Sequence, residues 1–87
     1  MKKITMFVIH SCPHCKAAFK WMDELYAKNP AYKNLEIEVI DENEQPEIAN
    51  QHEYYYVPTY YVDGVKLHEG TASLDKIQKV FDAALEE

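Results

Sequence analysis

Apolar and polar positions predict a strand, a helix and a second strand in the first half of the chain. Residues 3–9 form a short apolar run rich in β-branched and aromatic side chains, which is typical of a buried strand. Over residues 13–28, apolar side chains recur at spacings of three and four, which predicts an amphipathic helix that stops at Asn29 and Pro30. Apolar and acidic residues then alternate over residues 35–41 and predict a second strand.

The second half predicts a short helix, a hairpin and a final helix. A proline at residue 46 suits the start of a helix through about residue 51, because the first helical turn leaves its N–H groups unpaired in any case. An Asp-Gly pair at residues 63–64 is typical of a two-residue turn, here between strands over residues 59–62 and 65–69. Apolar residues at helical spacing over 74–85, behind a capping serine at Ser73, predict the last helix.

The predicted order is βαβαββα, an α/β fold with a mixed four-stranded sheet flanked by helices. The first two strands are expected to be parallel because a crossover helix joins them, whereas the hairpin strands are antiparallel. With 87 residues and no linker rich in Pro, Gly or Ser, residues 1–87 are expected to form a single domain.

Candidate chemistry is concentrated in Cys12-Pro13-His14-Cys15, between the first predicted strand and the first predicted helix. Free N–H groups and the positive end of the dipole at a helix N-terminus favour an anion, so we expect Cys12 to be a thiolate at neutral pH. Cys15 follows one turn later, close enough to displace a substrate bound to Cys12 and close an intramolecular disulfide. The motif therefore predicts thiol–disulfide exchange.

Composition restricts the partners and the compartment. Nine lysines and fifteen carboxylates give a net charge of −6, which argues against nucleic acid and anionic membranes as partners. The apolar run over residues 4–9 is too short for a membrane span or a signal-peptide core, so we expect a cytoplasmic protein. Two cysteines at one place cannot form a disulfide framework, and in a reducing compartment they favour catalysis or metal binding.

Three short motifs carry a resemblance to a known family. They are Cys12-Pro13-His14-Cys15, Val57-Pro58-Thr59 before the third predicted strand, and Val62-Asp63-Gly64 at the hairpin. These motifs resemble the thioredoxin superfamily, specifically its short glutaredoxin-like members, over nearly all 87 residues. The resemblance implies the minimal thioredoxin fold. It also implies that Pro58 has a cis peptide bond and lies against the dithiol, where the backbone of Val57 pairs with the bound substrate.

The resemblance also implies individual roles in the dithiol motif and beside it. Cys12 corresponds to the attacking cysteine, and Cys15 to the buried resolving cysteine, whose higher pKa keeps it protonated until it reacts. Pro13 and His14 are supporting residues. His14 resembles the histidine of strongly oxidising periplasmic members and would stabilise the Cys12 thiolate, so we expect a potential between about −270 mV and about −120 mV. Tyr56 and Thr59, on either side of Val57-Pro58, are the other candidate substrate-binding residues.

The chain also departs from both subfamilies. Glutaredoxins usually carry a basic residue three positions before the first cysteine, where this chain has Ile9, and an acidic cluster after a Gly-Gly pair, where it has Glu69 followed by Gly-Thr-Ala-Ser. The lost cation and the added Glu69 are expected to weaken glutathione binding by about 1–3 kcal/mol. Thioredoxins carry a tryptophan before the first cysteine and a buried aspartate on the first strand, and here Ser11 and Met6 occupy those places.

These features predict an enzyme, a thiol-disulfide oxidoreductase that reduces protein or small-molecule disulfides through a mixed disulfide. The Cys12–Cys15 disulfide would be regenerated by an external dithiol or a thioredoxin reductase-like flavoprotein, and we expect no metal or nucleotide cofactor. Two alternatives stay open, a glutathione-dependent glutaredoxin and a non-catalytic module that binds thiols or metal. His10 and His14 stand with the two cysteines as four possible ligands, although a structural zinc site normally draws two ligands from a second segment.

The remaining histidines and aromatic residues have simpler interpretations. His10 either tunes the thiolate or lies solvated at a strand end, His52 and His68 are expected on the surface, and Trp21 is expected to pack. Five tyrosines could build an aromatic rim on a substrate groove, yet strands favour tyrosine, so we expect most of them to be packing residues. They are Tyr54, Tyr55, Tyr56, Tyr60 and Tyr61.

Overall fold

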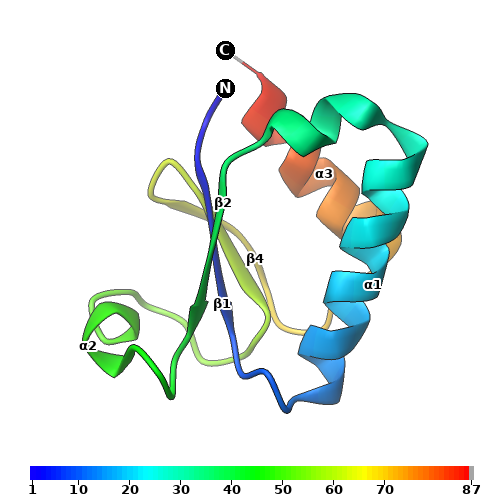
Figure 1. Cartoon of the computed structure of the whole chain (residues 1–87). Coiled ribbons are helices and arrows are strands. Elements are labelled where there is room, and N and C mark those ends of the chain that lie inside the picture. The colour runs from blue at the N-terminus through cyan, green and yellow to red at the C-terminus, as the bar shows by residue number, and fades with distance from the viewer. Residues whose placement is uncertain (87) are drawn as a thin grey trace.

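A computed structural model describes residues 1–86 and shows a mixed four-stranded sheet with helices on both faces (Figure 1). The strand order is β2-β1-β3-β4, with β1 parallel to β2 and antiparallel to β3, and with β3 and β4 forming an antiparallel hairpin. The predicted fold and strand directions are therefore confirmed. The elements are β1 (Ile4–Val8), α1 (Pro13–Lys28), a 3-10 helix η1 (Pro30–Asn34), β2 (Ile37–Asp41), α2 (Pro46–Ala49), β3 (Thr59–Val62), β4 (Val65–Glu69) and α3 (Leu74–Leu85).

Each face of the sheet has its own apolar cluster. Helices α1 and α3 cover one face, where Cys15, Ala18 and Leu25 of α1 are fully buried against the sheet (Figure 1). The short helix α2 covers the opposite face, over a smaller cluster that includes Phe7 and Ile40. No helix within residues 1–86 is long and apolar enough to cross a lipid bilayer.

Element boundaries differ slightly from the predicted ones. The second strand was expected from residue 35, but it begins at Ile37 because η1 precedes it and the Leu35 N–H closes that helix by donating to the Tyr32 carbonyl at 3.1 Å. The short helix expected through about residue 51 ends at Ala49. Both changes are local and leave the order of the elements unchanged.

Two predicted local signals are confirmed in detail. Asp63 and Gly64 both have positive φ angles, 47° and 83°, which the two-residue turn between β3 and β4 requires. Asp63 Oδ1 also accepts a hydrogen bond from the Lys3 N–H at 2.9 Å, which fastens the hairpin to the start of β1. Ser73 Oγ accepts from the Lys76 N–H at 3.2 Å and caps α3.

Candidate active site

The dithiol lies at the junction between β1 and α1. Cys12 is the N-cap residue of α1, in an extended conformation, and its N–H donates to the Ile9 carbonyl at 2.9 Å. The Cys12 carbonyl accepts the first helical hydrogen bond, from the Lys16 N–H at 3.0 Å. Pro13 occupies the first helical turn, as its sequence position suggests. The sheet and the helix therefore place the two thiols one turn apart, with Cys12 half-buried and Cys15 fully buried.

Hydrogen bonds to the sulfur favour the thiolate of Cys12. Backbone N–H groups of Cys15 and then of His14 lower the pKa of Cys12 below its ordinary value, and a hydrogen bond from the Cys15 thiol adds to this. These donors are the unpaired amides of the first helical turn. Cys12 is thus the more acidic thiol of the pair.

Cys15 is shifted in the opposite direction. Burial, together with the nearby charges of Cys12 and Asp41, raises the pKa of Cys15 to about 11. A thiol in this environment keeps its proton near neutral pH. The two sulfurs of one motif therefore have clearly separated acidities.

The His14 side chain is exposed, and its imidazole makes no hydrogen bond within residues 1–86. The contribution of His14 to the acidity of Cys12 comes from its backbone N–H. An electrostatic effect of the imidazole on the thiolate stays a prediction.

Pro58 directly precedes β3, and the Val57–Pro58 peptide bond is cis, as the resemblance implied. Thr59 pairs with Phe7 in the antiparallel register of β3 and β1, so residues 57–58 lie beside the end of β1 that leads to Cys12. Val57 and Cys12 both pack at the margin of the same core cluster.

The backbone of Val57 is open. Neither its N–H nor its carbonyl makes a hydrogen bond within residues 1–86. The neighbouring groups are engaged, because the Pro58 carbonyl accepts from the Gly70 N–H at 2.9 Å and Thr59 Oγ1 donates to the Tyr56 carbonyl at 2.5 Å. One peptide unit beside the dithiol is thus free to pair with an extended chain.

Sequence reasoning missed Asp41, a buried carboxylate at the end of β2 that is 7% exposed. It accepts hydrogen bonds from the backbone N–H of His10 at 2.9 Å and of Asn43 at 2.8 Å, and it contacts His10 Nδ1 at 2.5 Å. These bonds, led by the His10 backbone, lower the pKa of Asp41 to about 2. The sequence signal that could have identified Asp41 is its position at the carboxyl end of β2. This strand is parallel to β1, and the register pairs Asp41 with Val8, shortly before Cys12.

His10 is therefore more than a solvated residue at a strand end. Its ring pairs with Asp41 and lies parallel to Phe19, with ring centroids 6.3 Å apart. His10, Asp41 and Glu44 also form the group of residues best placed to hold a cation, with ligand atoms within 4.8 Å of one another. Neither cysteine belongs to this group, so the four-ligand set drawn from residues 10–15 is not assembled within the described part of the chain.

Two histidines expected on the surface are half-buried instead. The His52 ring lies 4.7 Å from that of Phe7 and 5.0 Å from that of Tyr61. His68 Nε2 contacts the Gly70 carbonyl at 2.9 Å. His52 lies in the turn after α2 and His68 lies in β4, and their ring contacts depend on residues that the local sequence does not bring together.

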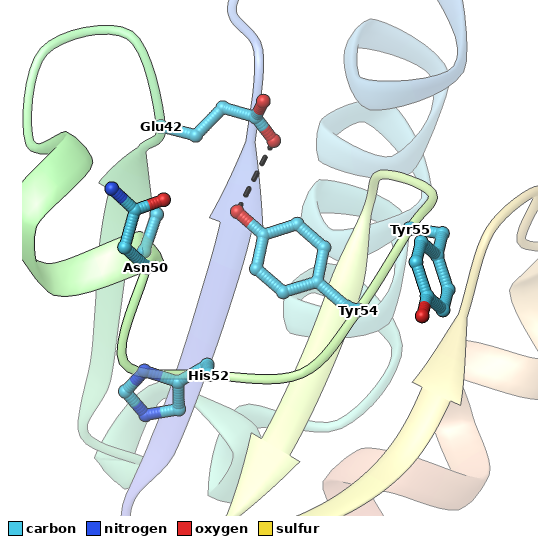
Figure 2. A pocket seen from close by; sticks show the side chains of 6 residues that line it. Glu42, Asn50, His52, Tyr54 and Tyr55 are labelled. Carbon is cyan, nitrogen blue, oxygen red and sulfur yellow. Dashed lines mark hydrogen bonds between the residues drawn. The ribbon is translucent and has the colours of Figure 1, made fainter.

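A polar pocket of about 250 Å³ lies on the face of the sheet that α2 covers, away from the dithiol (Figure 2). Tyr54 reaches across it and donates a hydrogen bond to Glu42 Oε1 at 3.1 Å. Asn50, His52 and Tyr55 also line the pocket, as Figure 2 shows. The pocket contains none of the predicted site residues.

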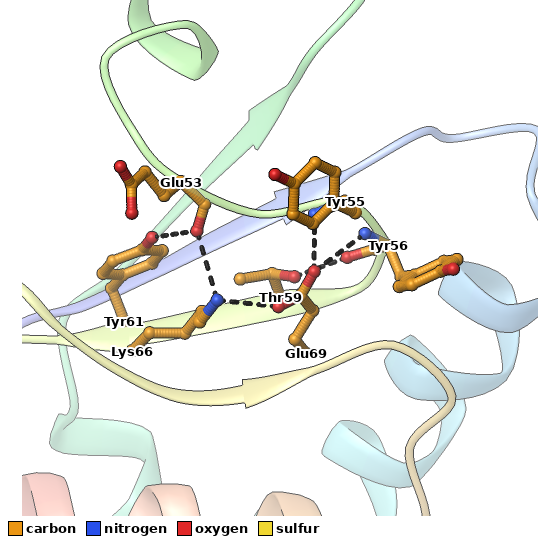
Figure 3. Close-up of polar contacts among 7 residues, drawn as sticks. All are labelled: Glu53, Tyr55, Tyr56, Thr59, Tyr61, Lys66 and Glu69. Carbon is orange, nitrogen blue, oxygen red and sulfur yellow. Dashed lines mark hydrogen bonds and ion pairs between the residues drawn. The ribbon is translucent and has the colours of Figure 1, made fainter.

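Glu69 has a different role from the one expected. Its carboxylate does not lie free in the substrate groove but accepts from the N–H groups of Tyr55 at 2.5 Å and Tyr56 at 3.1 Å, and it forms an ion pair with Lys66 at 2.7 Å (Figure 3). Lys66 and these amides lower the pKa of Glu69 to about 2. The carboxylate thus fastens the segment before Pro58 to β4.

Comparison with known proteins agrees with this geometry. A family model described as a thioredoxin domain matches residues 2–82. The chain belongs to the thioredoxin superfamily. Among curated proteins, no sequence gives a significant match to this thioredoxin-like chain.

Several solved thioredoxins have the same fold at low sequence identity. Oxidised thioredoxin from Plasmodium falciparum superposes with a TM-score of 0.73 and 17% identity, over 98% of this chain and 82% of that one. A thioredoxin variant from Halobacterium salinarum gives 0.70 and 19%, over 99% and 76%. Thioredoxin 1 from Thermosipho africanus gives 0.60 and 21%, over 97% and 99%. These similarities establish the fold of the thioredoxin-like chain.

Proposed function

We propose that this protein is a thiol-disulfide oxidoreductase that reduces disulfides of proteins or small molecules. The Cys12 thiolate attacks one substrate sulfur, a mixed disulfide forms, and the other substrate sulfur leaves as a thiolate. Cys15 then loses its proton and attacks the Cys12 sulfur, which releases the second substrate thiolate. The substrate gains two electrons, and the protein is left with a Cys12–Cys15 disulfide.

The divergent acidity of the two thiols is the observation that supports this proposal most directly. Helix amides stabilise the thiolate of Cys12, which is the attacking form. Burial and the Asp41 charge keep Cys15 protonated until Cys12 has formed the mixed disulfide with the substrate. A thiolate is the nucleophile in exchange, and a buried thiol is inert until the reaction reaches it. The pair therefore has the asymmetry that a two-step exchange requires.

The substrate would bind along Val57, next to Cys12. The free N–H and carbonyl of Val57 can pair with an extended backbone in the way that an added strand does. Pro58 and Thr59 are buried and hold this segment in place, and Tyr56 borders it. We assign substrate binding to these residues, and a supporting role to Pro13 and His14 beside the thiols.

The oxidised form requires an external electron donor. A dithiol or a thioredoxin reductase-like flavoprotein fits best, because Ile9 stands where glutaredoxins carry a basic residue that would pair with a glutathione carboxylate. Such a cycle suits the cytoplasm, where thiols are kept reduced. Comparing rates of regeneration by glutathione with glutathione reductase and by thioredoxin reductase tests this choice, and a faster rate with glutathione would contradict it.

Cysteine variants test the proposed function. Cys12→Ser should abolish both turnover of a small disulfide and formation of a mixed disulfide. Cys15→Ser should abolish turnover while trapping a mixed disulfide on Cys12, which mass spectrometry detects. Equal residual activity in both variants, or trapping on Cys15, would overturn the assignment.

A further inference from the structure

The polar pocket on the α2 face of the sheet has no part in the exchange chemistry of the dithiol (Figure 2). Its lining offers one carboxylate, one side-chain amide, one imidazole and two phenol rings, from Glu42, Asn50, His52, Tyr54 and Tyr55, with Ala49 beside them. Its volume of about 250 Å³ is smaller than that of a typical cofactor site, so it fits a ligand no larger than one long side chain.

The aromatic wall of the pocket is built on the core. Tyr54 stacks on Phe7, with ring centroids 4.9 Å apart and an angle of 25° between the rings. Phe7 does not line the pocket, so the ring face of Tyr54 that is turned away from Phe7 borders it. The His52 ring lies 4.7 Å from the same Phe7 ring. Both rings are therefore held in place without a ligand, and binding does not have to order them.

The five neighbouring tyrosines divide between the core and the surface. The expectation that most of them pack is confirmed for Tyr54, Tyr60 and Tyr61. Tyr55 and Tyr56 are instead 91% and 70% exposed. Of this exposed pair, Tyr55 lines the pocket. Its ring has no role in the core and is available to a ligand.

Several acceptors in the pocket have no partner. The Tyr54 hydroxyl donates to Glu42 Oε1 at 3.1 Å, which leaves Glu42 Oε2 without a hydrogen bond within residues 1–86. His52 Nδ1 lies 3.1 Å from the Ile48 carbonyl and must be the donor, so Nε2 of the neutral ring is an acceptor. The Asn50 side-chain amide also makes no hydrogen bond in this part of the chain. The pocket therefore matches a ligand that brings several N–H donors.

The charge around the pocket favours a cation. Residues 41–53 contain aspartate and glutamate but no lysine or arginine, and no basic side chain among the described residues lines the pocket. Lys66 Nζ reaches the Glu53 carbonyl at 3.3 Å, but its ammonium is paired with Glu69 at 2.7 Å. An anion would thus meet the unpaired Glu42 carboxylate, whereas a cation would neutralise it.

The lining suits an organic cation better than a metal ion. The pocket offers only Glu42 and His52 as common metal ligands. The trio of ligand atoms that does come together within residues 1–86, at His10, Asp41 and Glu44, lies outside the pocket. Aromatic rings favour a guanidinium in particular, because it is planar and weakly hydrated, stacks on ring faces, and presents a fork of N–H donors.

We propose that this pocket binds a guanidinium group, with Glu42 and Asn50 accepting its hydrogen bonds and with the rings of Tyr54 and Tyr55 stacking on its plane. Two sources carry this group, an arginine side chain of a partner protein and a free alkylguanidine. The proposal goes beyond the oxidoreductase function and does not depend on it, because the pocket lies on the opposite face of the sheet from the core that contains Cys15.

Titration of the reduced protein with N-acetyl-arginine methylamide, followed through the NMR shifts of the Asn50 and Tyr55 amides, tests the site. The neutral isostere N-acetyl-citrulline methylamide is the matched control at constant ionic strength. The arginine compound should bind about tenfold more tightly, because the citrulline compound keeps the shape but lacks the charge. Equal dissociation constants for the two compounds would overturn the proposal.

Two carboxylate variants separate the pocket from the general acidity of the surface. Glu42→Gln keeps an acceptor for the Tyr54 hydroxyl but removes the charge, so it should weaken binding of the arginine compound about tenfold. Glu47→Gln removes the same charge from an exposed position of α2 outside the lining and should change binding less than about twofold. An equal loss in both variants would show unspecific attraction only and would overturn the site.

Ring variants and a second pair of ligands complete the test. Tyr55→Phe should keep the affinity and Tyr55→Ser should weaken it about threefold, while the rate of Cys12 alkylation by iodoacetamide stays unchanged in both. Unchanged affinity in Tyr55→Ser would contradict the stacking. Tighter binding of an acetylated Gly-Ser-Arg-Ser-Gly amide than of propylguanidine would support an arginine of a partner protein, and the reverse order would support a free guanidine. Absence of shifts at the pocket with both ligands would overturn the guanidinium site and leave the oxidoreductase function untouched.

Discussion

The Asp41 carboxylate accepts two hydrogen bonds from one residue, His10, through the backbone N–H at 2.9 Å and through Nδ1 at 2.5 Å. Because these bonds hold the pKa of Asp41 near 2, the carboxylate is ionised at neutral pH, and Nδ1 must be the donor. The pair joins the end of β2 to the loop that leads to Cys12. It also places a fixed negative charge close to the Cys15 thiol.

Removal of that charge should make Cys15 more acidic. We expect Asp41→Asn to lower the pKa of Cys15, because the carboxylate disfavours a second negative charge nearby. The rate of iodoacetamide alkylation of Cys15 as a function of pH, with Cys12 replaced by Ser in both proteins, isolates the Cys15 titration. Glu44→Gln is the matched control, since this exposed carboxylate also lies near His10, at 3.6 Å, but does not act on Cys15. An equal or higher pKa in Asp41→Asn would contradict the prediction.

Acid should weaken the fold through Asp41 and Glu69. Both carboxylates have pKa values of about 2 in the folded protein, below the ordinary 3.8 and 4.5, so they stabilise the folded state above those ordinary values. This stabilisation should disappear as the pH falls from about 4.5 to about 2. Urea unfolding at several pH values measures the free energy of unfolding. Between about pH 4.5 and pH 2, this free energy should fall less in Asp41→Asn and in Glu69→Gln than in the wild type. Glu24→Gln, at an exposed carboxylate of α1, should show the full loss.

The cap of α3 should have a measurable effect on stability. Ser73→Ala removes the acceptor for the Lys76 N–H and should lower the free energy of unfolding by about 1 kcal/mol. Ser73→Asp keeps an acceptor and should restore most of the loss. Chemical denaturation at pH 7 measures the free energy of unfolding of both variants. An unchanged free energy in Ser73→Ala would show that solvent satisfies the Lys76 amide equally well.

Much of the fold could be predicted because its signals lie within single segments. Pro13 and Ser73 mark helix starts, and Asp63-Gly64 marks the hairpin turn, through conformational preferences of the residues themselves. The 3-10 helix η1 was missed because a single turn after a proline has no periodicity to detect. Its presence delays the start of β2 to Ile37.

The site was only partly predictable for a related reason. Cys12 and Cys15 are adjacent in the chain, and their spacing already indicates exchange chemistry. Asp41 meets His10 only through the register of two parallel strands, and Glu69 meets Tyr55 only through the pairing of β3 with β4. Contacts between distant segments depend on registers that composition and spacing leave open.

The imidazole of His14 should contribute less to thiolate stability than its backbone. His14→Tyr keeps the N–H that lowers the pKa of Cys12, so we expect only a small rise in that pKa and a small fall in the redox potential. The pH profile of iodoacetamide alkylation and equilibration with a thiol buffer measure the two quantities. His52→Gln, on the opposite face of the sheet, serves as the control. An unchanged profile in His14→Tyr would refute a role for the imidazole, and a large rise would assign it the dominant one.

Alkylation of the reduced protein should distinguish the two thiols without any substitution. Limiting iodoacetamide at pH 7 should modify Cys12 well before Cys15, because a thiol with a pKa of about 11 is ionised in only about one molecule in ten thousand and Cys15 is also fully buried. Peptide mapping by mass spectrometry gives the ratio of the two products. In urea the ratio should approach one, because unfolding removes both the helix amides and the burial. Comparable modification of both cysteines in the folded protein would mean that the acidity difference on which the exchange mechanism depends does not exist.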